Sequence, residues 1–144
     1  MKLTANDNTA PGGKTQAPPA GMYLCEIQSV KKALSKVKAT PYLAVRFKIT
    51  AGPQIGKRLF DRAYLTESAT WRIINLMLAA GHHKGTELDT DDPTDLMNKF
   101  QGRALFVTTA DDEYNKMIDG KQVVEVGYKV VAYDSTEAQQ DGAD

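Results

Sequence analysis

Cationic and aromatic side chains alternate along residues 58–65, which read RLFDRAYL. In an extended strand successive side chains point to opposite faces, so Arg58, Phe60, Arg62 and Tyr64 would share one face. Guanidinium groups neutralise phosphates and flat rings stack on unpaired bases, which is the chemistry that single-stranded nucleic acid requires. The segment therefore predicts a nucleic-acid-binding surface, provided that this face is exposed to solvent.

The opposite face of the same strand carries three apolar residues and one acid, namely Leu59, Asp61, Ala63 and Leu65. Burying the two arginines instead would be costly, because a guanidinium is almost never fully buried without a partner. Burying the apolar face leaves Asp61 as the one misfit, which a β-bulge or a strand end would relieve. We therefore predict that Phe60 and Tyr64 are exposed. The alternative, in which these rings pack beneath a helix and the arginines pair with carboxylates, stays open.

Charge is unevenly distributed along the chain, although the formal net charge is zero. Residues 31–62 contain nine basic residues and one acid, whereas residues 87–144 contain fourteen acids and five bases. This asymmetry favours a polyanion-binding half and an acidic half, although runs of charge often form nothing more than solvated surface.

Period-two patterns predict three strands in the first half of the chain, at residues 22–30, 42–50 and 58–65. Residues 31–41 read as a basic loop or a ragged strand end. Residues 66–81 read as a helix that Thr66 or Ser68 caps, with Trp71, Ile74 and Leu78 on its apolar stripe and Met77 flanking it. A short helical turn follows at 94–100, with Asp92 as its cap. Strand four is expected at 103–109 and strand five at 122–133, joined by a polar loop over 110–121.

The predicted order of strand, strand, strand, helix, strand, strand indicates a mainly β protein. We expect a five-stranded, partly open Greek-key barrel of the oligonucleotide-binding (OB) type, with a helix between strands three and four. An SH3-like barrel or a small α+β sheet would use similar elements. Composition predicts a flexible N-terminal arm at 1–20, one nucleic-acid-binding domain at 21–133 and a disordered acidic tail at 134–144.

In an OB barrel the faces of strands two and three bind oligonucleotides, together with the loops that join strands one to two and four to five. The candidate contacts are therefore Lys31, Lys32, Lys36 and Lys38 from the first loop, Tyr42, Arg46 and Lys48 from strand two, Lys57 from the turn before strand three, Arg58, Phe60, Arg62 and Tyr64 from strand three, and Tyr114, Lys116 and Lys121 from the second loop.

Other classes of function have weaker support. The acidic stretch at 87–95 lacks the glycine and the distal glutamate of a calcium loop, so we expect neither a metal site nor catalysis, and no cofactor. The single cysteine, Cys25, reads as a small core residue and cannot form an internal disulfide. No apolar run approaches the roughly 20 residues of a membrane span, and no secretory signal is evident, so we expect a cytoplasmic protein with no membrane partner.

The sequence resembles the phage-encoded single-stranded-DNA-binding proteins with an OB fold. The resemblance is carried by PPAGMYLCEI (18–27), YLAVRFKITAGPQIGKRLFDRAYL (42–65), ATWRIINLMLAAG (69–81) and LMNKFQGRALFVTT (96–109). It implies sequence-tolerant, non-catalytic binding of single-stranded DNA during phage DNA replication or recombination, in the cytoplasm of the host cell. Acidic tails in such proteins compete for the DNA groove and recruit replication or recombination proteins, often through a terminal apolar tip. This chain ends QQDGAD, without such a tip.

Two alternatives remain at this point. The same barrel would also serve as a non-catalytic protein-interaction module, such as a phage assembly or anti-host factor. The exposed strand edges of an open barrel allow either a monomer or a homodimer.

Overall fold

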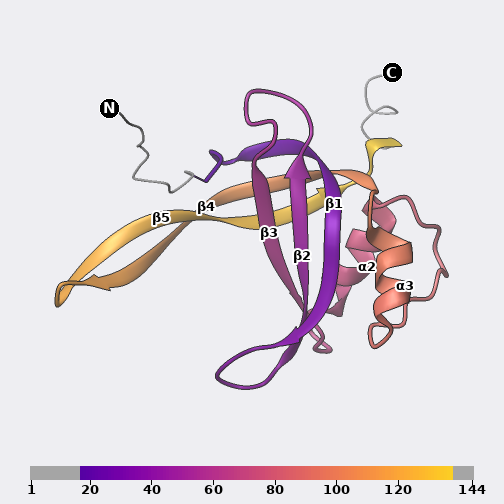
Figure 1. Ribbon diagram of the computed structural model, residues 1–144, viewed down its shortest axis with the longest axis horizontal. Helices are drawn as coiled ribbons and strands as arrows, with labels where there is room; N and C mark the ends of the chain where they lie inside the picture. The colour runs from indigo at the N-terminus through magenta and orange to yellow at the C-terminus, as the bar shows by residue number, and fades with distance from the viewer. Residues whose placement is uncertain (1–16, 138–144) are drawn as a thin grey trace, which may run out of the picture.

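The computed structural model of the protein describes residues 17–137, and the fold is mainly β (Figure 1). Five antiparallel strands form one sheet in the order β3-β2-β1-β4-β5. The strands are β1 (Gly21–Leu34), β2 (Pro41–Ile49), β3 (Arg58–Tyr64), β4 (Ala104–Ile118) and β5 (Lys121–Asp134), and the helices are α2 (Thr70–Ala79) and α3 (Pro93–Phe100). The mainly β class, with a helix between the third and fourth strands, is confirmed. The predicted arm (1–20) and tail (134–144) lie mostly outside the described residues, and Asp134 ends β5.

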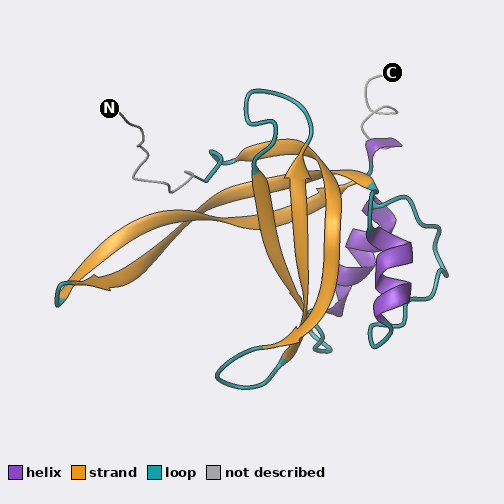
Figure 2. Ribbon diagram, viewed as in Figure 1, coloured by secondary structure: helices purple, strands orange, loops and turns teal. Residues whose placement is uncertain are grey.

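The long strand β1 holds the sheet together because it pairs with two neighbours. Its first part pairs with β4, and most of its length pairs with β2. The sheet curls enough to bring β5 close to β3, its other outer strand: the backbone N–H of Phe60 donates to the Tyr128 hydroxyl oxygen at 2.7 Å, and the Tyr133 hydroxyl donates to Asp61. In the sheet, β3 lies beside β2 (Figure 2). The side chains of Tyr128 and Tyr133 on β5 contact β3 on its other side.

The core lies between the concave side of the sheet and the two helices. Phe47 on β2 and Phe100 on α3 are among its largest fully buried side chains. Asp92 caps α3 as predicted, since its carboxylate accepts from the Thr94 N–H at 3.0 Å. Neither of these helices is long and apolar enough to cross a membrane.

The predicted apolar stripe of α2 is wrong. Trp71 and Ile74 are exposed, whereas Ile73 and Leu76 are buried together with Met77, which the prediction placed only at the flank of the stripe. A stripe at i, i+3 and i+4 starts equally well from residue 73, and this second stripe faces the core. The predicted caps are also wrong, because the N-cap position is Ala69 and no side chain caps the helix.

The predicted polar loop at 110–121 is wrong as well. The fourth strand continues to Ile118 and pairs with β5 along the whole stretch. Asp119 and Gly120 form the turn, with φ of 52° and 76°, as the Asp-Gly pair of a tight hairpin requires. Residues 111–126 form a two-stranded arm that extends away from the rest of the protein (Figure 1). The residues of this arm are polar because both of its faces are exposed to solvent, and not because they form a loop.

The buried position of Cys25 leads to a simple prediction. Its side chain is fully buried on the core face of β1, and burial raises the pKa of the thiol to about 12. Because the thiolate is the reactive form, we expect the folded protein to resist alkylation by iodoacetamide at pH 8. Mass spectrometry should show full labelling only after unfolding in urea. Rapid labelling of the folded protein would contradict the buried position of Cys25 on β1.

Candidate functional site

The outer face of β1, β2 and β3 brings the predicted rings and cations together. The register places Tyr42 opposite Tyr64 and Arg46 opposite Phe60 on neighbouring strands, and residues paired in this way share a face. Leu59 and Ala63 are fully buried, whereas the Phe60 side chain is 52% exposed. The predicted orientation of β3 is therefore confirmed, but Tyr64 is half-buried rather than exposed.

The rings and guanidinium groups on this face touch one another. The ring centroids of Tyr42 and Tyr64 are 5.5 Å apart. The Arg46 guanidinium lies 5.4 Å from the Phe60 ring centroid, and that of Arg62 lies 5.0 Å from the Tyr42 centroid. These distances are within the range of cation–π contacts. The face thus presents rings already flanked by positive charge.

The cations of this face are available to an anionic ligand. Within residues 17–137, the ion pairs are Lys32–Asp91, Arg72–Asp61, Lys99–Asp95 and Lys116–Glu125. None of them involves the outer-face cations, which are Lys31, Arg46, Lys48, Arg58 and Arg62. Arg58 donates from Nε to the Gln28 side-chain oxygen at 3.1 Å, which keeps its charge uncompensated.

Three neighbouring hollows form a continuous track over this face. The first lies between the β1–β2 loop and the pair Tyr42 and Arg62. The second contains the same two residues together with Lys31, Arg46 and Phe60. The third runs from Phe60 to Tyr128 and is also lined by Pro18, Lys57 and Arg58. Shared residues connect the hollows, so an extended ligand would cross β2 and β3 and end beside β5.

Most predicted site residues lie along this track. They are Lys31, Lys36, Lys38, Tyr42, Arg46, Lys57, Arg58, Phe60, Arg62 and Tyr64, with Lys48 beside Arg58 on the same face. Tyr128 also lines the track, and sequence reasoning missed it because only the curl of the sheet brings β5 to β3.

Four predicted site residues lie elsewhere. Lys32 is next to Lys31 but alternates to the opposite face, where its amine pairs with Asp91. Tyr114 and Lys116 are on the arm and contact the same residue, Glu125, at 3.0 Å and 4.0 Å. Lys121 starts β5 at the tip of the arm. These residues belong to the arm and the helix side, not to the track.

Beneath the track, Asp61 anchors β3 to the rest of the fold. Its carboxylate accepts from Arg72 Nη2 on α2 at 2.5 Å and from the Tyr133 hydroxyl on β5. Burial first, and then the charge of Asp61, raise the pKa of Tyr133 well above its usual value, so this hydroxyl remains a donor. The prediction that a bulge or a strand end accommodates Asp61 is wrong. Instead, the ion pair with Arg72 compensates the charge of the Asp61 carboxylate.

A family model described as "Protein of unknown function (DUF669)" matches residues 4–144. The chain belongs to this family. No curated protein matches the sequence. The family description states no ligand, so the assignment of function depends on the chemistry of the outer face.

The acidic loop of this DUF669 chain has structural roles. Asp91 pairs with Lys32 and Asp92 caps α3. Asp95 accepts from the Asp89 N–H at 2.7 Å and from Lys99 Nζ at 2.9 Å, and these two bonds, the backbone one first, lower the pKa of Asp95. The carboxylates are thus used in fixing the loop that leads into α3.

Proposed function

We propose that the protein binds single-stranded DNA, without sequence preference, along the track across β2 and β3. The observation that carries the proposal is the presence of cations without ion-pair partners in the described part of the chain, the exposed Phe60 ring and the half-buried Tyr42 and Tyr64 rings on one sheet face in a fixed register. The cations would neutralise phosphates, while Phe60, Tyr42 and Tyr64 would stack on bases. Every base has a π-face, so this mode of binding tolerates any sequence. In duplex DNA the bases are paired and unavailable for such stacking.

We also propose that the five strands form a barrel of the OB type. Two features support this: β1 pairs with both β2 and β4, and β5 approaches β3 through Tyr128 and Tyr133. In OB barrels, oligonucleotides lie on the face of strands two and three between the flanking loops. The track lies on the corresponding face of this sheet, beside the β1–β2 loop. The cellular role would be to cover single-stranded DNA exposed in replication or recombination, as the resemblance to phage proteins implies.

Salt dependence gives a direct test of the phosphate contacts. If the five outer-face cations each meet a phosphate, log K should fall with log salt at a slope near roughly −3.5, because each contact with a single strand contributes about −0.7. Arg46→Ala should make this slope less steep by about 0.7. Fluorescence anisotropy of labelled oligo(dT), titrated at several salt concentrations, measures both values.

The matched control is Lys84→Ala, which removes an exposed cation from the loop after α2, outside the track. It should leave the slope unchanged. A slope near zero for the unmodified protein, or equal effects of Arg46→Ala and Lys84→Ala, would contradict the proposed path of the DNA and favour a protein-interaction module.

A further inference from the structure

Part of the edge of β1 runs beside α3 without a strand partner. The first residues of β1, Gly21–Glu26, pair with β4 along this edge. Ile27 then closes the paired part, since its N–H donates to the Arg103 carbonyl at 2.9 Å and its carbonyl accepts from the Gly102 N–H at 2.8 Å. Beyond Ile27, in the part of the chain that the structure describes, no strand pairs with this edge.

Backbone groups of β1 point toward this edge at alternate residues. Ile27, which faces the core, makes its backbone bonds on the α3 side, whereas the outward-facing Leu24 accepts from Thr50 on the β2 side. Side chains and backbone groups alternate together along a strand. A β-bulge between Ile27 and Ser29 adds one residue to β1, so the next residues on the same face as Ile27 are Val30 and Lys32. Their N–H and C=O groups therefore also point toward α3. Among residues 17–137, no backbone or side-chain group is bonded to them there.

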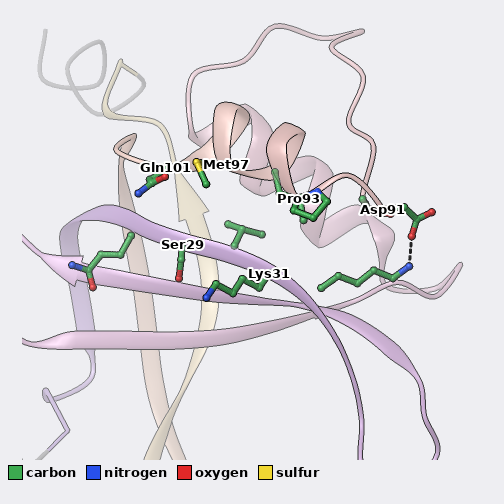
Figure 3. A pocket seen from close by; sticks show the side chains of 11 residues that line it. Ser29, Lys31, Asp91, Pro93, Met97 and Gln101 are labelled. Carbon is green, nitrogen blue, oxygen red and sulfur yellow. Dashed lines mark hydrogen bonds and ion pairs between the residues drawn. The ribbon is translucent and has the colours of Figure 1, made fainter.

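A groove of about 530 Å³ lies between this edge and α3 (Figure 3). Its apolar lining comes from Val30 on β1 and from Pro93, Leu96 and Met97 on α3. Ser29 and Lys31 lie along its β1 side, and the Lys32–Asp91 ion pair lies at the end nearest Pro93 (Figure 3). Unused strand donors and acceptors therefore face an apolar surface that carries a cationic rim.

We propose that this groove binds an extended peptide segment of another protein, which adds to β1 as a further strand. Strand addition uses the backbone groups of Val30 and Lys32 for affinity, and it places alternate peptide side chains on the apolar lining. Lys31 has no carboxylate partner within residues 17–137. The fitting peptide thus alternates apolar residues, which lie on Leu96 and Met97, with acidic residues, which lie beside Lys31. The groove lies on the α3 side of β1, away from β2 and β3, although Lys31 lines both the groove and the track. The proposal does not rest on the DNA function.

The test uses a library of fluorescent heptapeptides with Asp or Glu at alternate positions and Val, Ile, Leu, Met or Phe between them. We expect members of the library to bind the full-length protein with Kd below about 100 μM, a free energy near −5.5 kcal/mol. The best peptide should slow hydrogen exchange at the amides of Val30 and Lys32, as measured by NMR. The same peptide with N-methylated backbone amides should bind at least tenfold more weakly.

Met97→Glu places a negative charge in the groove, at a position where the methionine side chain is 56% exposed. The matched control, Met117→Glu, makes the same change on the arm, where the methionine side chain is 66% exposed. We expect Met97→Glu to weaken peptide binding at least tenfold and to leave oligo(dT) affinity unchanged, whereas Met117→Glu should not affect peptide binding. Absence of binding across the library, or equal binding when Lys replaces the acidic residues, would overturn the proposal. So would competition for the groove by a second copy of the protein.

Discussion

Replacement of Phe60 by alanine is expected to weaken binding of oligo(dT) by about 1 to 3 kcal/mol, which is roughly a 5- to 150-fold rise in Kd. The ring is 52% exposed at the point where two hollows of the track meet, beside the Arg46 guanidinium. Its removal takes away one stacking platform and leaves the core untouched, because Phe60 points away from it. Anisotropy titrations at fixed salt give the change in Kd, and circular dichroism confirms that the fold is unchanged.

Trp71 provides the matched control for Phe60. It is the one tryptophan of the sequence and is 54% exposed, but it lies on α2, away from the track. Trp71→Ala should leave Kd within about twofold of the unmodified value, since no hollow of the track includes it. If the two substitutions had equal effects, or if neither changed Kd, the rings of the outer face would not be the stacking site.

Asp61→Ala is expected to lower the free energy of unfolding by about 2 to 4 kcal/mol. The carboxylate holds both Arg72 and the Tyr133 hydroxyl, and its side chain is only 13% exposed. Without it, a guanidinium and a hydroxyl that remain largely buried lose their acceptor. The expected loss of unfolding free energy is smaller than for a fully buried ion pair, because the Arg72 side chain retains some contact with water. Urea unfolding, followed by Trp71 fluorescence, should show a lower midpoint at an unchanged slope.

Asp91→Ala is the control for this ion pair. It removes the carboxylate that pairs with Lys32, but that carboxylate is far more exposed than Asp61. We expect a loss below about 1 kcal/mol, as is usual for exposed pairs. Asp61→Asn, which keeps an acceptor oxygen for Tyr133, should fall between the two. Equal losses for Asp61→Ala and Asp91→Ala would mean that the ion pair beneath β3 does not hold the strand in place.

The sequence predicts the outer face well because charge decides the orientation of β3. Two guanidinium groups in one phase and two leucines in the other leave little choice about which face is buried. Once that orientation is set, Phe60 must share the outer face with Arg46, and the register with β2 that the structure shows then places the two residues opposite one another. Lys32 shows the limit of the same reasoning. In the predicted basic loop, side chains do not alternate between two faces, so Lys32 cannot be assigned to a face. In the structure β1 extends to Leu34, and this alternation directs Lys32 away from the outer face.

The arm and Tyr128 mark where sequence reasoning fails, for two different reasons. The polarity of residues 110–121 favours a loop, yet Asp119 and Gly120 are the residues of a tight hairpin turn, so a signal for the arm was present. No such local signal exists for Tyr128. Its hydroxyl reaches the Phe60 N–H only because the sheet curls, which depends on packing between distant segments.

The most direct test of the proposed function is a competition experiment with labelled oligo(dT). The protein is titrated into the labelled strand at low salt, and unlabelled single-stranded DNA or duplex DNA of equal length is then added as competitor. We expect tight binding that unlabelled single strands displace and that duplex does not, because only unpaired bases can stack on the rings of the outer face. Absence of binding at micromolar protein, or equal displacement by duplex, would contradict the proposal that the track binds single-stranded DNA.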